Sequence, residues 1–411
     1  MRTPRPPIAI TGMGVKTPIG LELDSFWAGL RSGRSAGAPI RSWDTSEHPV
    51  KFACEIPDFD IGAYLSPKES AHLDRVTQLG FAAAVDALAS AGELGADPAR
   101  IGVVAGTGVG GLLTLEGQIE TYVGKGAMRV SPFLVPMMMS NATAAFISIY
   151  HGFTGPNFCV VTACAAGANA LGEAARLIRD GDADVVIAGG AESSITAVGL
   201  AAFNRMTALS RRTDDPARAS RPFDPGRDGF VMGEGAGFCV LESWERAEAR
   251  GAHIYGGIAG YGRNTDAYHI THPSPGGEGA VRCMQLALED AGMSPSDIGH
   301  VNAHGTSTPI NDAAEAEAVL KVFGEPAPPI TSVKGATGHL IGAAGAVEAI
   351  ASILAIRAGE VFPTANHDET DPALGPIDVV HGAPRPLAAA PALSNSFGFG
   401  GHNASLVLIP A

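Results

Sequence analysis

VVTACAAGANAL, residues 160–171, runs from a short β-branched segment directly into a row of small residues that carries one cysteine. The pattern predicts a buried strand, a tight turn and a helix whose first turn holds Cys164, because apolar residues recur at helical spacing from Ala168 to Ile178. Backbone N–H groups and the helix dipole favour a thiolate at such a position, and the thiolate is the nucleophile. Most unpaired cysteines are small core residues, however, so the position alone leaves both roles open.

The composition is that of a large, layered α/β protein. The chain has 411 residues, 45% of them hydrophobic and 17% charged, which is too long for one simple core and suggests two domains or a duplicated one. The net charge of −14, without a Lys/Arg run, disfavours nucleic acid as a partner. Five scattered cysteines favour a reducing cytoplasm over a disulfide framework or metal site. No apolar run approaches a membrane span and no signal peptide is recognisable, so we expect no membrane contact.

An internal sequence repeat suggests two similar halves. Residues 86–107 read as a helix ending in Ala-Gly, a connector and a strand ending in Gly-Thr, and residues 286–306 repeat that order. Each half also opens on a strand with Gly-x-Gly, and the first of these is predicted over residues 8–14 as a buried strand ending in a glycine turn. We therefore predict two duplicated α/β halves, residues 1–250 and 251–411.

Gly106, Gly108 and Gly111 match the GxGxxG spacing of a dinucleotide site. No strand ending in an acidic residue follows at the expected distance. The spacing therefore favours glycines that let a strand end pack closely against a neighbouring element.

Three further stretches carry more polar chemistry than their apolar settings explain. One is a predicted strand end with His304 and several hydroxyl groups, and another places Lys334 and His339 ahead of a small-residue helix that Glu348 interrupts. The third is a glycine turn that presents Phe399. Each alone has a structural explanation, since a histidine at a strand end is usually structural and a lysine before a helix is usually solvated. Together with the cysteine they indicate catalysis.

These stretches resemble the signature of the β-ketoacyl-acyl-carrier-protein synthases, the decarboxylating condensing enzymes of the thiolase superfamily, and most closely the elongating type, β-ketoacyl synthase II. The resemblance covers essentially the whole chain and is carried by Cys164, HGTST at 304–308, Lys334, Gly338-His339 and FGFGG at 397–401. It implies a thiolase-like fold, in which two duplicated α/β halves form a layered αβαβα core.

The resemblance also implies catalytic roles. Cys164 would hold an acyl chain as a thioester, with an oxyanion hole made by its own backbone N–H and that of Phe399. His304 and His339, as neutral imidazoles, would stabilise the enolate that forms when a malonyl-carrier protein loses CO2. Phe399 would also gate the cysteine, with the flanking glycines as its hinge. No metal or other cofactor is implied.

Substrate and carrier contacts are implied as well. Lys334 would orient His339 and Glu348 in a buried polar network, because a buried lysine needs a charged partner. Thr306 and Thr308 would bind the phosphopantetheine arm. The acyl pocket would be lined by Val109, Phe133, Met137, Met138, Met139 and Phe203, for which a plain core role is equally open. Basic residues would dock an acidic acyl carrier protein, the candidates being Lys68, Lys125, Arg129, Arg205, Arg211 and Arg212. Thr207 stands where the fatty-acid enzymes carry an arginine, which leaves the carrier's identity open.

Competing interpretations differ in pathway and in partner. The leading one is fatty-acid elongation by a homodimer. The alternative is a ketosynthase subunit of a type II polyketide or polyene pathway, in a heterodimer with a chain-length factor. The intact HGTST and Thr-Gly-His stretches favour the fatty-acid class. A non-catalytic chain-length subunit is disfavoured because such subunits lack the nucleophile, and a degradative thiolase because no cysteine follows Cys283.

Overall fold

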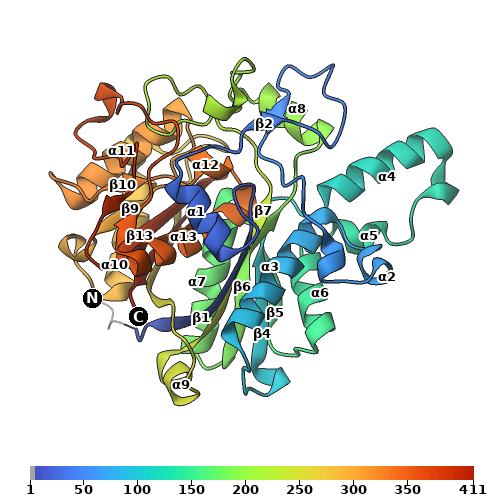
Figure 1. Cartoon of the computed structure of the whole chain (residues 1–411), viewed down its shortest axis with the longest axis horizontal. Helices are drawn as coiled ribbons and strands as arrows, with labels where there is room; N and C mark the ends of the chain where they lie inside the picture. The colour runs from blue at the N-terminus through green and yellow to red at the C-terminus, as the bar shows by residue number, and fades with distance from the viewer. Residues whose placement is uncertain (1–4) are drawn as a thin grey trace.

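A computed structural model describes residues 5–411 of the chain (Figure 1). Within these residues the main sheet has ten strands in the order β10-β9-β13-β14-β8-β1-β7-β6-β4-β5. The first half of the chain supplies β1 (Ile8–Lys16), β4 (Ile101–Gly106), β5 (Asn157–Val160), β6 (Val185–Glu192) and β7 (Gly235–Ser243). The second half supplies β8 (Gly256–Thr265), β9 (His300–Asn302), β10 (Ile330–Thr331), β13 (Ala392–Gly398) and β14 (His402–Ile409). Short pairs form elsewhere: β2 (Ala38–Pro39) with β3 (Phe52–Ala53), and β11 (Glu360–Val361) with β12 (Arg385–Pro386).

The two halves of the sheet repeat one topology. In the first half β4 pairs in parallel with β5 and β6, and the sheet continues antiparallel from β6 through β7 to β1. In the second half β9 pairs in parallel with β10 and β13, and the sheet continues antiparallel from β13 through β14 to β8. An antiparallel pairing of β1 with β8 joins the halves. This repetition is the duplicated α/β architecture that the sequence predicted.

Helices form three layers around the sheet. α7 (Ala166–Arg179) and α13 (Ala344–Ala358) contact each other at the centre and share one apolar core with both halves (Figure 1). α3 (Arg75–Ala91) covers the opposite face of the first half, and α10 (Glu278–Ala291) that of the second. The other helices are α1 (Leu23–Arg31), α2 (Pro67–Ser70), α4 (Leu112–Lys125), α5 (Leu134–Met138), α6 (Ala142–His151), α8 (Ala197–Arg205), α9 (Trp244–Ala249), α11 (Pro309–Phe323) and α12 (Lys334–Thr337).

The glycines of the two Gly-x-Gly strands let the outer helices lie directly on the sheet backbone. A Cβ atom at Gly12 would lie 2.1 Å from the carbonyl oxygen of Ala87 in α3, and one at Gly260 would lie 2.2 Å from that of Ala287 in α10. Only glycine permits this approach. The glycine turn predicted at the end of residues 8–14 is therefore wrong, because β1 continues through Gly12 and Gly14 to Lys16.

Two further expectations need correction. β5, predicted to be buried, is the last strand in the sheet order and pairs only with β4, so Phe158 in β5 is 38% exposed and Val161 just after it 50%. The helical segment Ile341–Ala358 is long and apolar enough to span a membrane, with a mean hydropathy of 1.6, although no such run was expected. It is 83% buried within the protein, as the central core helix α13 requires.

Candidate active site

Cys164 lies in the 3-10 turn Ala163–Ala165, between β5 and α7. Ala163 has a φ of 50°, a left-handed conformation that is strained for a residue with a side chain. The turn holds the thiol in the interior, where Cys164 is 9% exposed. The cysteine thus precedes the helix, rather than lying in its first turn, and the predicted strand, turn and helix are all present.

Two other strained loops meet this turn. His339 lies between α12 and α13, two residues before Ile341, whose φ is 45°. His304 follows β9 and lies three residues before Ser307, whose φ is 69°. Strained backbone of this kind persists where the surrounding structure holds it, and it is concentrated at functional sites.

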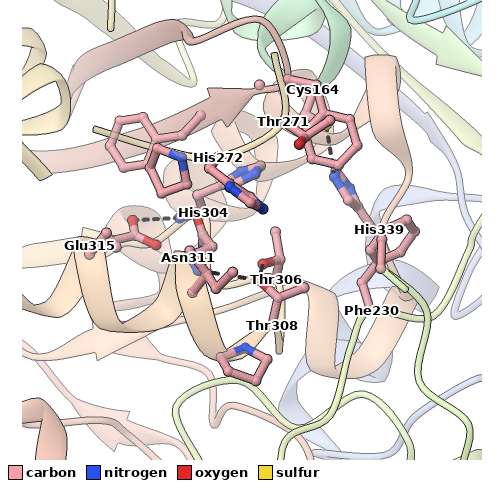
Figure 2. Close-up of a pocket in the computed structure, with 18 of the residues that line it drawn as sticks. Cys164, Phe230, Thr271, His272, His304, Thr306, Thr308, Asn311, Glu315 and His339 are labelled. Carbon is pink, nitrogen blue, oxygen red and sulfur yellow. Dashed lines mark hydrogen bonds between the residues drawn. The ribbon is translucent and has the colours of Figure 1, made fainter. Parts of the chain in front are cut away.

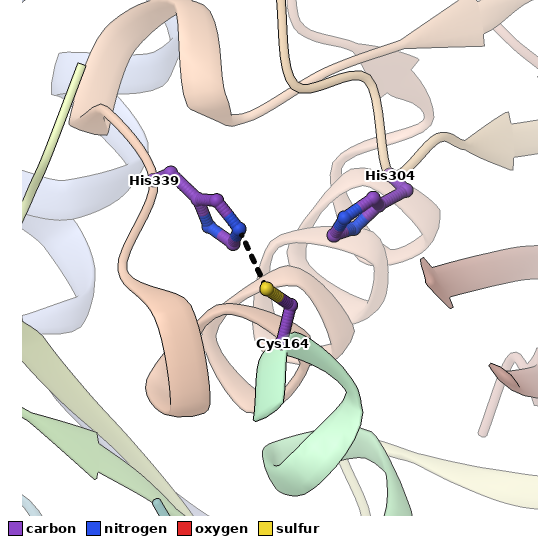
Figure 3. A group of neighbouring side chains, drawn as sticks. All are labelled: Cys164, His304 and His339. Carbon is purple, nitrogen blue, oxygen red and sulfur yellow. Dashed lines mark hydrogen bonds between the residues drawn. The ribbon is translucent and has the colours of Figure 1, made fainter. Parts of the chain in front are cut away.

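The three side chains converge at one point (Figure 3). Nε2 of His339 lies 3.0 Å from Sγ of Cys164, and the rings of His304 and His339 stand edge to face with centroids 5.4 Å apart. The backbone N–H of Ile341 donates to Nδ1 of His339 over 3.2 Å, so the ring proton is on Nε2. The His339 N–H therefore points at the sulfur.

Lys334 fixes the second histidine. Its Nζ lies 3.3 Å from Nδ1 of His304 and donates to the His304 carbonyl oxygen over 2.6 Å. An ammonium group has only donors, so Nδ1 accepts and Nε2 of His304 carries the proton. Glu315 holds the same loop, since its carboxylate accepts from the backbone N–H of His304 and of Gly305, both at 2.8 Å.

The predicted Lys334–Glu348 pair is present, and both side chains are 1% exposed. The predicted contact from Lys334 to His339 is wrong: the lysine bonds His304 instead, because His304 Nδ1 faces the interior side where Lys334 and Glu348 lie. Glu348 is likewise part of this buried pair and does not line the cavity that holds the three side chains.

The electrostatics keep both imidazoles neutral. Burial, with the Lys334 charge as a second cause, lowers the pKa of His304 and of His339 well below the usual value. Burial also raises the pKa of the Cys164 thiol to about 11, against the Lys334 charge and a backbone hydrogen bond from Phe399, which lower it. The sequence expectation of a resting thiolate is therefore not met, whereas neutral imidazoles agree with the predicted enolate role.

A metal ion is the other ligand that this group of donors suggests. The ligand atoms of Cys164, His304 and His339 lie within 4.8 Å of one another, as in a zinc site. In both rings, however, Nδ1 is an acceptor and Nε2 carries the proton. The Nε2 atoms thus face the sulfur side as donors, which suits an oxygen anion better than a cation.

A cavity of about 370 Å³ leads from the surface to these side chains (Figure 2). Of the predicted residues, Cys164, His304, His339, Thr306, Thr308, Phe203 and Phe399 line it. The sequence analysis missed Phe230, Thr271, His272 and Asn311, which also line it. Phe230 stands edge to face with His339, with ring centroids 5.3 Å apart. Of these four residues, only Asn311 could have been found from the sequence, because it lies three residues after the predicted substrate-binding residue Thr308, at the start of α11.

Five of the six predicted acyl-pocket residues do not line this cavity, namely Val109, Phe133, Met137, Met138 and Met139. Val109 and Phe133 are 42% and 41% exposed, and Met137 lies in α5 on the same side of the molecule. Phe133 stacks on His72 with ring centroids 3.8 Å apart. Of the predicted docking residues, Arg212 is half-buried and the other five are exposed: Lys68 lies in α2, Lys125 and Arg129 at and beyond the end of α4, Arg205 at the end of α8, and Arg211 in the segment after it. Arg205 is closest in sequence to the cavity, whose wall includes Met206 and Thr207.

The family models for the β-ketoacyl synthase N-terminal and C-terminal domains match residues 5–247 and 255–368. The chain belongs to the β-ketoacyl synthase family. A curated relative from Synechocystis sp. (strain ATCC 27184 / PCC 6803 / Kazusa), 3-oxoacyl-acyl-carrier-protein synthase 2, is 47% identical over 405 residues, or 97% of each chain.

Solved structures agree. The ishigamide ketosynthase/chain length factor superposes with a TM-score of 0.92 at 36% identity, over 99% of this chain and 100% of that one. A type II polyketide acyl-carrier protein in complex with its ketosynthase, bound to the hexaketide, gives 0.89 at 30% identity over 100% of both chains. The protein is therefore a β-ketoacyl synthase with a thiolase-like fold. It is an acyltransferase that condenses an acyl chain with a malonyl group on an acyl carrier protein, and it needs no separate cofactor.

Proposed function

We propose that this β-ketoacyl synthase elongates fatty acids by holding the growing chain on Cys164 and using His304 and His339 to decarboxylate the malonyl donor. The observation that carries the proposal is the convergence of one sulfur and two protonated Nε2 atoms at the inner end of the cavity. Each imidazole is fixed through Nδ1, so neither has to reorganise when charge develops.

In the first half-reaction the Cys164 sulfur attacks the thioester carbonyl of an acyl-carrier protein. The bond from sulfur to the acyl carbon forms, the bond to the carrier's sulfur breaks, and the proton lost by Cys164 is taken up by the departing thiolate. The backbone N–H of Phe399 already bonds the cysteine sulfur. It is thus placed to stabilise the oxyanion together with the N–H of Cys164.

In the second half-reaction a malonyl thioester enters the same cavity. Loss of CO2 leaves an enolate, and its oxygen accepts hydrogen bonds from the Nε2–H groups of His304 and His339. The enolate carbon attacks the Cys164 thioester, a carbon–carbon bond forms, and the cysteine leaves as a thiolate that recovers a proton. Lys334 acts through His304 as a positioning residue, while Thr306 and Thr308, whose hydroxyl groups lie 2.8 Å apart in the cavity wall, bind the arm.

The pathway follows from the degree of similarity. The relative at 47% identity is a 3-oxoacyl-acyl-carrier-protein synthase 2, whereas the ishigamide ketosynthase/chain length factor is 36% identical and the type II polyketide ketosynthase 30%. The polyketide alternative is thus the less supported. Within the proposal the division between halves falls near residue 250, at the crossing from β7 to β8, and the enzyme works in the cytoplasm, where its thiol stays reduced.

The proposed assembly is a homodimer that binds the carrier protein near the cavity mouth. Figure 1 shows α4 projecting from the body, and none of its residues is buried. Exposed apolar side chains extend from α4 through α5 and α6 to the open edge of β5, among them Val123, Met128, Val135, Ile149 and Phe158. Such a surface is larger than the scattered apolar residues of a monomer, and a second copy would cover it. A chain-length factor at the same place is the heterodimeric alternative.

The test is mass spectrometry of the protein after incubation with a series of acyl-carrier proteins. An acyl mass is expected on Cys164, and the chain length most readily transferred defines the substrate. Cys164→Ala should abolish acylation and condensation while malonyl decarboxylation remains measurable. Full condensation by Cys164→Ala would overturn the proposal.

A further inference from the structure

The cavity wall contains no lysine or arginine among the residues that the structure describes. Besides the Cys164 thiol, its ionisable side chains are three carboxylates, Asp228, Asp266 and Glu315, and three histidines, His272, His304 and His339. A phosphopantetheine arm carries a phosphodiester at the end remote from its thioester. When the thioester reaches Cys164, the phosphate lies near the outer end of the cavity. Its permanent negative charge then faces a wall that holds acidic groups and no lysine or arginine.

The carboxylates cannot assist an anion, and each is held by protein donors. Asp228 accepts from Oγ of Ser210 at 2.6 Å and from the backbone N–H of Arg211 at 3.2 Å. Asp266 accepts from Nδ2 of Asn403 at 2.7 Å and from the backbone N–H of Ser274 at 2.9 Å. Glu315 bonds the His304 loop, as described above. These hydrogen bonds keep the three carboxylates in place on the cavity wall, and none of the three offers a hydrogen-bond donor to a phosphate.

The inner histidines are unsuitable as well. His304 and His339 are buried, neutral and committed to the reacting carbonyl. His272 differs because it is exposed and lies on the segment between β8 and α10, and Figure 2 shows its ring directed into the cavity. Within residues 5–411 its ring nitrogens have no hydrogen-bond partner, so both are available to a ligand.

His269 holds His272 in this position. The two rings stack with centroids 4.5 Å apart and planes 15° apart. Nδ1 of His269 accepts from the backbone N–H of Thr271 at 3.1 Å and of His272 at 3.3 Å. The Nδ1 atom of His269 is thus engaged with the backbone of this segment, whereas both ring nitrogens of His272 have no partner among the described residues and stay free to meet a ligand.

We propose that His272 binds the phosphate of the phosphopantetheine arm and so distinguishes carrier-type thioesters from simple ones. Histidine gains its charge near neutral pH, and a charge-assisted hydrogen bond to phosphate is stronger than a neutral one. This assignment rests on the proposed function, since it takes the arm to be the substrate of this cavity. It makes His272 a specificity residue for substrate capture, with no part in bond making.

The experiment compares two malonyl thioesters as substrates of the acylated enzyme, malonyl-phosphopantetheine and malonyl-pantetheine, which differ only in the phosphate. With wild-type protein, kcat/KM is expected to favour the phosphorylated compound by about tenfold, the size of one charge-assisted bond. His272→Ala should reduce this preference to near unity, by raising KM for malonyl-phosphopantetheine alone. His272→Arg should keep the preference.

His253→Ala is the matched control, because His253 is also exposed and packs on an aromatic ring, that of Tyr255, outside the cavity wall. It should keep the wild-type preference. A tenfold preference that survives in His272→Ala, or one that Arg205→Ala removes instead, would overturn the assignment. Equal losses with both thioesters in His272→Ala would also overturn it. Failure of the wild-type enzyme to condense either thioester would overturn the proposed function itself.

Discussion

At the scale of single residues, chemistry here depends on which nitrogen of each imidazole carries its proton. Ile341 donates to Nδ1 of His339, and Lys334 donates to Nδ1 of His304. Both Nε2–H groups therefore face the reacting atoms without any proton transfer. Since burial keeps the rings uncharged, they can stabilise a developing enolate by donation and do not protonate it prematurely.

His304→Ala and His339→Ala should each slow malonyl decarboxylation by about 100- to 1,000-fold, the usual effect of removing one such donor. Acylation of Cys164 should persist, because its oxyanion is held by backbone N–H groups. Release of CO2 from malonyl-carrier protein measures the first effect, and the protein mass measures the second. His253→Ala serves as the control. Undiminished CO2 release from both variants would remove the histidines from the enolate role.

At the scale of elements, one carboxylate ties two active-site loops together. Oε2 of Glu192, at the end of β6, accepts from the backbone N–H of Gly108 at 2.7 Å and of Gly342 at 3.2 Å. Gly108 follows β4, and Gly342 follows the His339 loop into α13. Burial raises the pKa of Glu192 to about 7, although these hydrogen bonds lower it. A single ionisable group thus joins the strand ends of the first half to the histidine loop of the second.

Glu192 makes the stability of this junction depend on pH. Its folded pKa of about 7 exceeds the unfolded value of 4.5, so its stabilising effect is complete below pH 4.5 and is lost as pH rises through 7. The loss amounts to about 3 kcal/mol in the free energy of unfolding. Glu192→Gln resembles the protonated acid and should raise Tm by several degrees at pH 8 while leaving it nearly unchanged at pH 4. Thermal unfolding at both pH values measures this, and an equal change at the two would contradict it.

The sequence was most informative where a pattern is local. Helical spacing located α7, and the Ala-Gly stop located the end of α3. The repeated Gly-x-Gly pattern reflects helices that lie directly on the strands, since a Cβ atom at Gly12 or Gly260 would lie only 2.1 or 2.2 Å from a helix carbonyl oxygen. Local patterns could not place β5 at the sheet edge, because edge position depends on strand order. They also missed His272, since its segment reaches the cavity only when β8 and α10 are packed. Lys334 was assigned to the wrong histidine for the same reason: ring orientation depends on tertiary contacts.

At the scale of the whole molecule, the exposed apolar surface from α4 to β5 has the features of a subunit interface. β5 offers unpaired backbone groups along one edge, and an open edge flanked by apolar side chains invites pairing with another strand. Because β5 leads directly into the Cys164 turn, a partner there would support the nucleophile from behind. Assembly and catalysis are then linked through one strand.

Phe158→Lys should therefore give a monomer, because a lysine at this edge places an unpaired charge inside the proposed interface. Light scattering coupled to size exclusion reports the change from dimer to monomer. Since the Cys164 turn follows within a few residues, acyl transfer to Cys164 should fall with dissociation. Ile310→Lys, at a side chain that is 53% exposed beside the cavity, is the control and should remain dimeric. If the Phe158→Lys protein stays dimeric, the interface lies elsewhere. If the wild-type protein is monomeric until a homologous subunit is added, the heterodimer is favoured.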